Sequence, residues 1–154
     1  MKARTIGLTL ALCFVGVAVS FAADPNTGTW KLNEAKSKFS PGAPKNHTVV
    51  YEVVGDKMKV TVDGIDSGGK PTHNEWTGKF DGKEYAVTGD PTSDMRSYKR
   101  INARTLVFTA KQGGKVTGTG RIAVSADGKT RTVTTSGTDS KGKKFTATAV
   151  YDKQ

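Results

Sequence analysis

Met58-Lys59-Val60-Thr61-Val62 places an apolar residue at every second position, directly after the turn-type triplet Gly55-Asp56-Lys57. The same alternation occurs in Trp76-Thr77-Gly78-Lys79-Phe80 and on one face of Leu106-Val107-Phe108-Thr109-Ala110. Successive side chains of a β-strand point to opposite faces, so this period predicts strands with one buried face. The abundance of Thr and Val favours the same interpretation.

Glycine-containing turns separate these segments, and most carry a lysine beside the glycine. Asp81-Gly82 and Asp127-Gly128 are strong hairpin signals, because glycine readily adopts the positive φ that tight hairpins need. The other turns are Gly55-Asp56-Lys57, Gly69-Lys70, Gly89-Asp90-Pro91, Asn102-Ala103-Arg104, Gly114-Lys115 and Gly142-Lys143. We expect ten strands, at 28–32, 47–54, 58–65, 71–80, 84–88, 94–101, 105–111, 115–125, 130–138 and 144–152.

Short turns between consecutive strands predict an all-β, antiparallel up-and-down meander. A sheet of about ten strands would expose long edges unless it closed, so we expect a barrel with its first and last strands adjacent. A two-sheet sandwich is the alternative. Alternation predicts that the following side chains face inward: Val60, Val62, Trp76, Phe80, Tyr85, Leu106, Phe108, Ile122, Val124 and Phe145.

One connection, residues 33–46, is much longer than the others. It contains Ser40-Pro41-Gly42-Ala43-Pro44, which interrupts regular structure, and Asn33 is placed to cap a single helical turn after it. Connections of this length are often lids or binding loops.

The first residues have the pattern of a secretory signal peptide. Lys2 and Arg4 precede an uncharged apolar stretch over 6–21, and Ser20-Phe21-Ala22 supplies small residues for cleavage after Ala22, or alternatively after Ala23. We therefore expect residues 1–22 to be removed and 23–154 to form one exported domain, periplasmic or extracellular, without a transmembrane segment. Cys13, the single cysteine, lies in the leader, so the domain has no disulfide.

The chain is basic, with a formal net charge of +10. Such a charge favours anionic partners, and an anionic envelope surface is one candidate. The basic residues are mostly scattered turn lysines without interleaved aromatic residues, so we expect no nucleic-acid binding.

Gly28-Thr29-Trp30 at the start of the first strand resembles the Gly-x-Trp signature of the lipocalins and their calycin relatives. The long first connection followed by a meander also matches that pattern, over the whole of the exported domain. The chain lacks Asn-Phe before the glycine and the Thr-Asp-Tyr motif, so it resembles lipocalin-like exported bacterial barrels outside the kernel family. The resemblance implies that Trp30 closes the bottom of the barrel and that an arginine, for which Arg131 is the candidate, packs over it.

Arg96, Tyr98 and Arg100 share one face of a predicted strand. If that face points inward, two guanidinium groups line the barrel and are suited to bind a carboxylate or phosphate. Trp76 and Phe108 complete the predicted ligand-binding set. The alternative is that Met95 and Ile101 face inward and the arginines are solvated.

We find no catalytic constellation in the sequence. His47 and His73 are the two histidines, and with no cysteine beside them they predict no metal site; Glu75 shares the outward face of His73. We therefore expect no enzyme activity, no cofactor and no metal. The predicted function is binding of a small apolar or amphipathic, anionic ligand inside the barrel. The alternative is a surface-interaction module of the envelope or exterior whose barrel is filled.

Strand order also predicts which end of the barrel a ligand enters. In a meander successive turns lie at alternate ends, so the connection 33–46 shares one end with the turns at 66–70, 89–94, 111–115 and 139–144. This end has nine lysines against five acidic residues, whereas the other end is almost balanced. We expect the basic end to be the entrance, because a positive rim steers anions inward.

Overall fold

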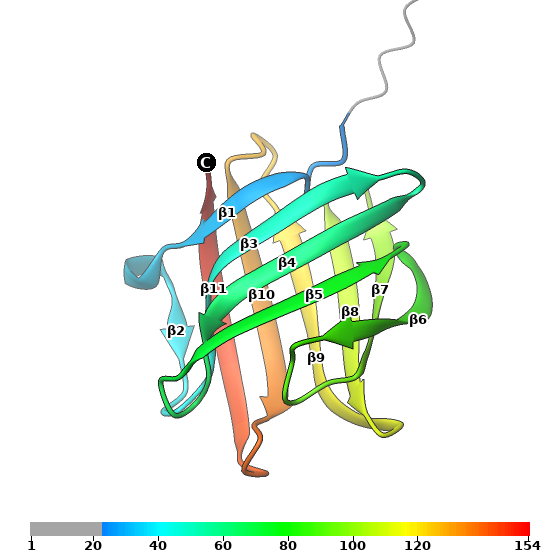
Figure 1. Cartoon of the computed structure of the whole chain (residues 1–154). Helices are drawn as coiled ribbons and strands as arrows, with labels where there is room; N and C mark the ends of the chain where they lie inside the picture. Colours follow the sequence, from blue (N-terminus) through cyan, green and yellow to red (C-terminus); the bar gives the residue numbers. More distant parts are fainter. Residues whose placement is uncertain (1–22) are drawn as a thin grey trace, which may run out of the picture.

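The computed structural model describes residues 23–154, so the predicted signal peptide lies outside the described residues. The described chain is an antiparallel barrel with one short 3-10 helix, η1 (Glu34–Lys36) (Figure 1). Its strands are β1 (Gly28–Leu32), β2 (Lys38–Phe39), β3 (Lys45–Val54), β4 (Lys57–Ile65), β5 (Pro71–Gly78), β6 (Asp81–Thr88), β7 (Met95–Asn102), β8 (Thr105–Gln112), β9 (Lys115–Val124), β10 (Thr130–Thr138) and β11 (Lys144–Lys153).

The strands follow one another around the barrel in chain order. From β3 to β11 each strand pairs antiparallel with the next, and β1 pairs with both β3 and β11. The pairing of Trp30 with Lys153 and of Leu32 with Tyr151 joins the first strand to the last. This arrangement confirms the predicted closed meander and excludes the sandwich. Within residues 23–154, no helix is long and apolar enough to span a membrane.

Two details of the prediction were wrong. The strand expected over 71–80 ends at Gly78, and the next begins at Asp81 rather than at 84, so Asp81-Gly82 is not the turn. Gly82, with φ of 81°, instead lies in an irregularity of the β6–β7 ladder, where the register shifts between Asp81 and Glu84. A positive-φ glycine suits a bulge as well as a hairpin, which explains the error.

The connection over 33–46 is held against the barrel by its own secondary structure. Asn33 caps η1 as predicted, with its side chain accepting from the amide of Lys36. β2 then pairs with the lower half of β11, and Ser40 exchanges two hydrogen bonds with the backbone of Thr146. The first part of the segment therefore completes the wall beside β11 (Figure 1), and its end, at Pro44 and Asn46, lines the cavity described below.

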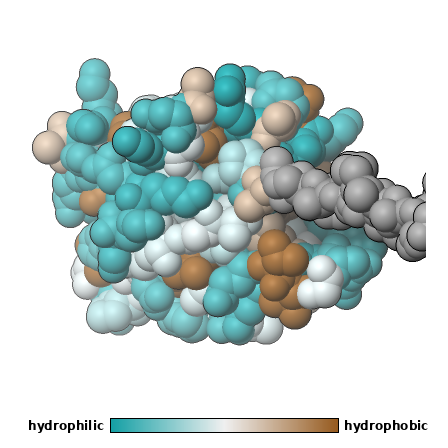
Figure 2. All heavy atoms as spheres, turned by 90° about the horizontal axis from the view of Figure 1, so that it is seen from above, coloured by the Kyte–Doolittle hydropathy of each residue, from teal (hydrophilic) through white to brown (hydrophobic). Residues whose placement is uncertain are grey.

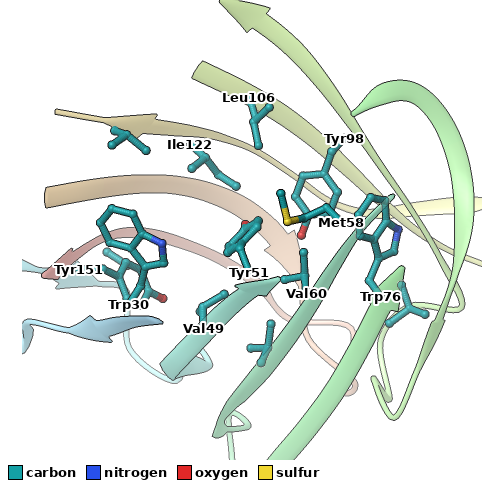
Figure 3. Packing of buried hydrophobic residues seen from close by; sticks show 14 residues of the cluster. Trp30, Val49, Tyr51, Met58, Val60, Trp76, Tyr98, Leu106, Ile122 and Tyr151 are labelled. Carbon is teal, nitrogen blue, oxygen red and sulfur yellow. The ribbon is translucent and has the colours of Figure 1, made fainter. Parts of the chain in front are cut away.

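The core lies on the inner face of the barrel, as the alternation predicted. Trp30, Val60 and Leu106 are completely buried, and Trp76 is 1% exposed (Figure 3). All ten residues predicted to face inward belong to this core, pack against it or line the cavity described below. Ile101 is half exposed, so on β7 the face of Arg96 and Tyr98, not that of Met95 and Ile101, points inward.

The residues just before β1 lie at the upper end of the barrel in Figure 1, where they contact Trp30 of β1 and Arg100 of β7; we call this the closed end. Asn26 is fully buried, and its carbonyl accepts a 2.8 Å hydrogen bond from the indole N–H of Trp30. Asp24 forms an ion pair with Arg100, whose guanidinium lies 5.1 Å from the Phe80 ring. Viewed from above, this end shows mostly hydrophilic side chains with separate hydrophobic patches (Figure 2). Both residue 23 and the C-terminus lie at this end.

Leu106→Ala should lower the free energy of unfolding by about 2–5 kcal/mol, because it leaves a cavity in a fully buried site. Ile101→Ala, at a position that is 50% exposed on the neighbouring strand, should cost about 1 kcal/mol or less. Urea unfolding of both variants measures the difference. Equal losses would contradict the inward and outward assignment of β7 and β8.

Candidate functional site: a cavity inside the barrel

A cavity of about 190 Å³ lies inside the barrel, between the loops at its lower end and Arg131 and Tyr151 toward its upper end. Its outer part is bounded by the loops that end β4, β6 and β10, namely by Asp66, Ser67, Asp90, Pro91, Thr92, Asp139 and Ser140. These loops belong to the end that the sequence predicted as the entrance. The cavity thus opens at the end of the barrel opposite to residue 23 and the C-terminus (Figure 1).

The cavity wall is largely apolar and aromatic. Its lining includes Val49, Val62, Phe108, Ile122, Val133, Phe145 and three tyrosines, Tyr51, Tyr98 and Tyr151. Space for the ring of Phe108 depends on Gly120, because a Cβ there would lie 2.4 Å from the ring. Tyr98 packs against Phe108 with ring centroids 5.9 Å apart. Figure 3 shows Tyr51 between the Trp30–Tyr151 side and the Tyr98–Trp76 side of the core.

Arg96 lies near the entrance, at the start of β7, and is 9% exposed. Its Nη2 donates to Oδ2 of Asp90 over 2.8 Å, and its Nη1 lies 3.5 Å from Oδ1 of Asn74. Asp90 also accepts hydrogen bonds from Thr92 and Ser93. Burial raises the pKa of Asp90, but the hydrogen bonds from Ser93 and Thr92 and the charge of Arg96 outweigh it and hold the pKa below its usual value. The guanidinium of Arg96 therefore already has an ionised carboxylate, that of Asp90, as its partner.

Arg131 lies deeper, near the start of β10, and is 2% exposed. Its guanidinium carbon lies 5.2 Å from the centroid of the Trp30 ring, 5.0 Å from Tyr51 and 4.8 Å from Tyr151. The contact with Trp30 is the one that the lipocalin resemblance implied. Within residues 23–154, Nε and Nη1 of Arg131 have no hydrogen-bond partner. A charged group without a polar partner therefore lines the inner part of the cavity.

Tyr51 and Tyr151 are neutral hydrogen-bonding groups at ordinary pH. Burial raises the pKa of Tyr151 to about 12, against a smaller lowering by Arg131. Burial also raises the pKa of Tyr51, although the charges of Arg131 and Arg96 oppose it. The cavity consequently combines phenol hydroxyls, two guanidinium groups and apolar surface.

The structure brings together part of the predicted ligand-binding set. Arg96, Tyr98 and Phe108 line the cavity, whereas Trp76 and Arg100 do not. Trp76 packs in the core behind the lining, where its indole N–H donates to the carbonyl of Arg96 over 2.9 Å. Arg100 points inward too, but at the closed end, where it pairs with Asp24. The two guanidinium groups of β7 therefore do not converge on one ligand, and ligand binding by these residues stays a prediction.

Fewer free lysines surround the rim than a count of lysines indicates. Lys45 pairs with Glu34 and Lys111 with Glu84, so these lysines are partly neutralised. Among the rim acids, Asp66 accepts hydrogen bonds from the amides of Gly68 and Lys70, and Asp139 from those of Lys141 and Lys143. These two carboxylates accept hydrogen bonds from the amides of their own turns. The same hydrogen bonds lower their pKa values, so both carboxylates stay ionised.

Sequence reasoning missed Asp90, Tyr51 and Tyr151 as parts of the cavity. Each of these residues lines the cavity only because closure of the barrel brings distant strands and loops together. In the sequence, Asp90 has the pattern of an ordinary turn residue. On the outer surface, His73 Nδ1 lies 2.6 Å from Asp63 and Lys59 Nζ lies 3.0 Å from Glu75. Across residues 23–154, no group of His, Cys, Asp and Glu side chains is arranged to hold a metal ion.

No protein-family model matches the sequence, and no curated protein matches it. Solved structures that resemble the chain include EF1p2_mFAP2b bound to DFHBI, with 15% identity and a TM-score of 0.48, covering 86% of this chain and 97% of that one. Another is a redesigned beta barrel, mFAP1, bound to DFHBI, with 15% identity and a TM-score of 0.43, covering 84% and 95%. Similarity at this level assigns the chain to no family.

Raising the pH from about 10 to about 12 should lower the free energy of unfolding. The pKa of Tyr151 is near 12 in the folded protein and about 10 when the chain is unfolded, so hydroxide ionises the unfolded state first. This group alone should account for roughly 2 kcal/mol between pH 10 and pH 12, because half of it is already ionised in the unfolded chain at pH 10. Urea unfolding at a series of pH values measures the slope, and Tyr151→Phe should flatten it. An equal slope in that variant would contradict the assignment.

Proposed function

We propose that this protein is an exported barrel that binds a small amphipathic organic anion in its internal cavity. The observation that carries the proposal is the combination of an apolar wall with two buried guanidinium groups, Arg96 and Arg131, in one cavity open at the rim. Ligand sites commonly combine apolar walls with a few well-placed polar groups. The proposal assigns no catalytic role to the chain.

The charge inside the cavity supports an anionic ligand. Both guanidinium groups are charged at any ordinary pH, while Asp90 is the carboxylate that neutralises Arg96. The interior away from the rim therefore has one positive charge in excess. Attraction between opposite charges is stronger in such a site than in water, because the effective dielectric constant is lower.

Export is the second element of the proposal, and it rests on sequence alone. Lys2, Arg4 and the uncharged stretch that follows have the form of a signal peptide, and the rest of the chain has no cysteine. A binding protein of this kind would meet its ligand in the periplasm or outside the cell.

Titration with a panel of amphipathic anions, octanoate and benzoate among them, should show saturable binding at low salt by isothermal calorimetry. Arg96→Gln should weaken binding, because it leaves the Asp90 carboxylate without its counter-charge beside the entrance, where it would repel an anion. Arg100→Gln is the matched control, on the same strand face but outside the cavity, and should leave binding unchanged. Thermal unfolding of both variants checks that they fold. No saturable binding by the wild type at any salt concentration would remove the proposal.

A surface-interaction module is the second candidate, and the outer face of β7–β10 favours it. These four strands contain no acidic residue, whereas each of β3, β4, β5 and β6 contains at least one. On their outward face Ser97, Thr109, Thr119, Ser136 of β10 and Thr146 of β11 are successive cross-strand neighbours, forming a row of hydroxyl groups. A shallow groove of about 550 Å³ lies over part of this row and is also lined by Arg121.

Binding to an immobilised acidic polysaccharide such as alginate tests this second candidate. Lys99→Glu combined with Arg121→Glu should abolish retention if the β7–β10 face makes the contact. Lys57→Glu combined with Lys129→Glu makes the same change in net charge at the closed end and should only reduce retention. Equal effects of the two pairs would show that net charge, and not this face, is responsible.

A further inference from the structure

We infer that Arg131 holds the acid group of the ligand and that the ligand is a single-ring aromatic acid. The inference rests on the proposed function, because it concerns the same cavity. It differs from the sequence-based prediction, which assigned the acid group to Arg96 and Arg100.

The first argument is the missing partner of a buried charge. Buried charged groups in proteins are normally paired or hydrogen-bonded, because removing a charge from water is costly. Arg131 is 2% exposed and, within residues 23–154, its Nε and Nη1 have no hydrogen-bond partner. Within residues 23–154 no carboxylate forms an ion pair with Arg131 either, so an anion in the cavity would be the counter-charge of this guanidinium.

The second argument is the contrast with Arg96. Arg96 already pairs with Asp90 at 2.8 Å, and Asp90 is fixed by Thr92 and Ser93. A ligand carboxylate at Arg96 would have to displace or lie beside an ionised carboxylate, which opposes binding. At Arg131 the aromatic rings of Trp30, Tyr51 and Tyr151 surround the cation without supplying an anion. A ligand anion there would meet no competing charge.

The third argument is the size and lining of the cavity. Its volume of about 190 Å³ is below the roughly 300 Å³ at which pockets for drug-sized ligands begin. An apolar protein cavity of roughly 150 Å³ holds benzene, so this one accepts a single ring with a short substituent. Phe108, Phe145 and Tyr98 line the part between Arg131 and the entrance, where edge or stacked contacts favour an aromatic ring. The volume is too small for a long alkyl chain.

Wild-type protein titrated with cinnamate and with cinnamamide tests the inference directly. The two probes have almost the same shape and differ in charge. Cinnamate should bind about tenfold to a hundredfold more tightly, because hydrogen bonds to charged groups are stronger than neutral ones. Decanoate, which has the same charge but a long chain, should bind more weakly than cinnamate. Comparable binding of cinnamate and cinnamamide would overturn the role of the acid group.

The location of the acid group is tested by NMR of the side-chain Nε–H signals in the same wild-type protein. Cinnamate should shift the signal of Arg131 strongly and that of Arg100 not at all, with Arg131→Lys serving to assign the signal. Arg131→Met should abolish the preference for cinnamate over cinnamamide, whereas Arg96→Gln should keep it. A shift confined to Arg96, or loss of the preference in Arg96→Gln alone, would overturn the assignment to Arg131.

These outcomes separate the inference from the proposed function. If octanoate or decanoate binds and cinnamate does not, the cavity binds amphipathic anions but the aromatic class is wrong. If no probe of the whole panel binds, the proposed function fails and the inference fails with it.

Discussion

Pairing between β1 and β11 is the constraint on which the rest of the structure depends. Trp30 and Leu32 lie opposite Lys153 and Tyr151, so residues separated by most of the chain close the sheet and leave no long free edge there. The same strand holds Trp30, whose indole N–H binds the carbonyl of Asn26 and seals the upper end. Closure also places Arg131 of β10 against Trp30 of β1, Tyr51 of β3 and Tyr151 of β11. The inner end of the cavity therefore exists only when the barrel is closed.

The strand alternation made most of the fold predictable. Val60, Trp76 and Leu106 face inward as expected, because a strand with one apolar face has a single favourable register. Gly82 was misleading, since the same positive φ serves a turn or an irregular ladder. β2 escaped prediction because two residues have no period, and its position depends on the lower half of β11.

The cavity was only partly predictable for a related reason. Alternation places Arg96 and Tyr98 on one face, and the structure confirms that this face is the inner one. Alternation does not indicate where along the barrel axis a side chain lies. Position along this axis is what separates Arg96, at the entrance, from Arg100, at the closed end. The pairing of Arg96 with Asp90 and the isolation of Arg131 depend on loops and on strands distant in the sequence. Local patterns therefore predicted the residue types of the site better than their roles.

The positions of the chain ends relative to the cavity entrance have a consequence for how the molecule can be attached to something else. Residue 23 and the C-terminus lie at the upper end of the barrel, and the cavity opens at the lower end (Figure 1). Anything joined at residue 23 or at the C-terminus, whether a partner domain, an affinity tag or a solid support, would lie at the end of the barrel away from the cavity entrance. Immobilising the protein through its C-terminus should therefore not obstruct the exchange of small molecules at the cavity entrance.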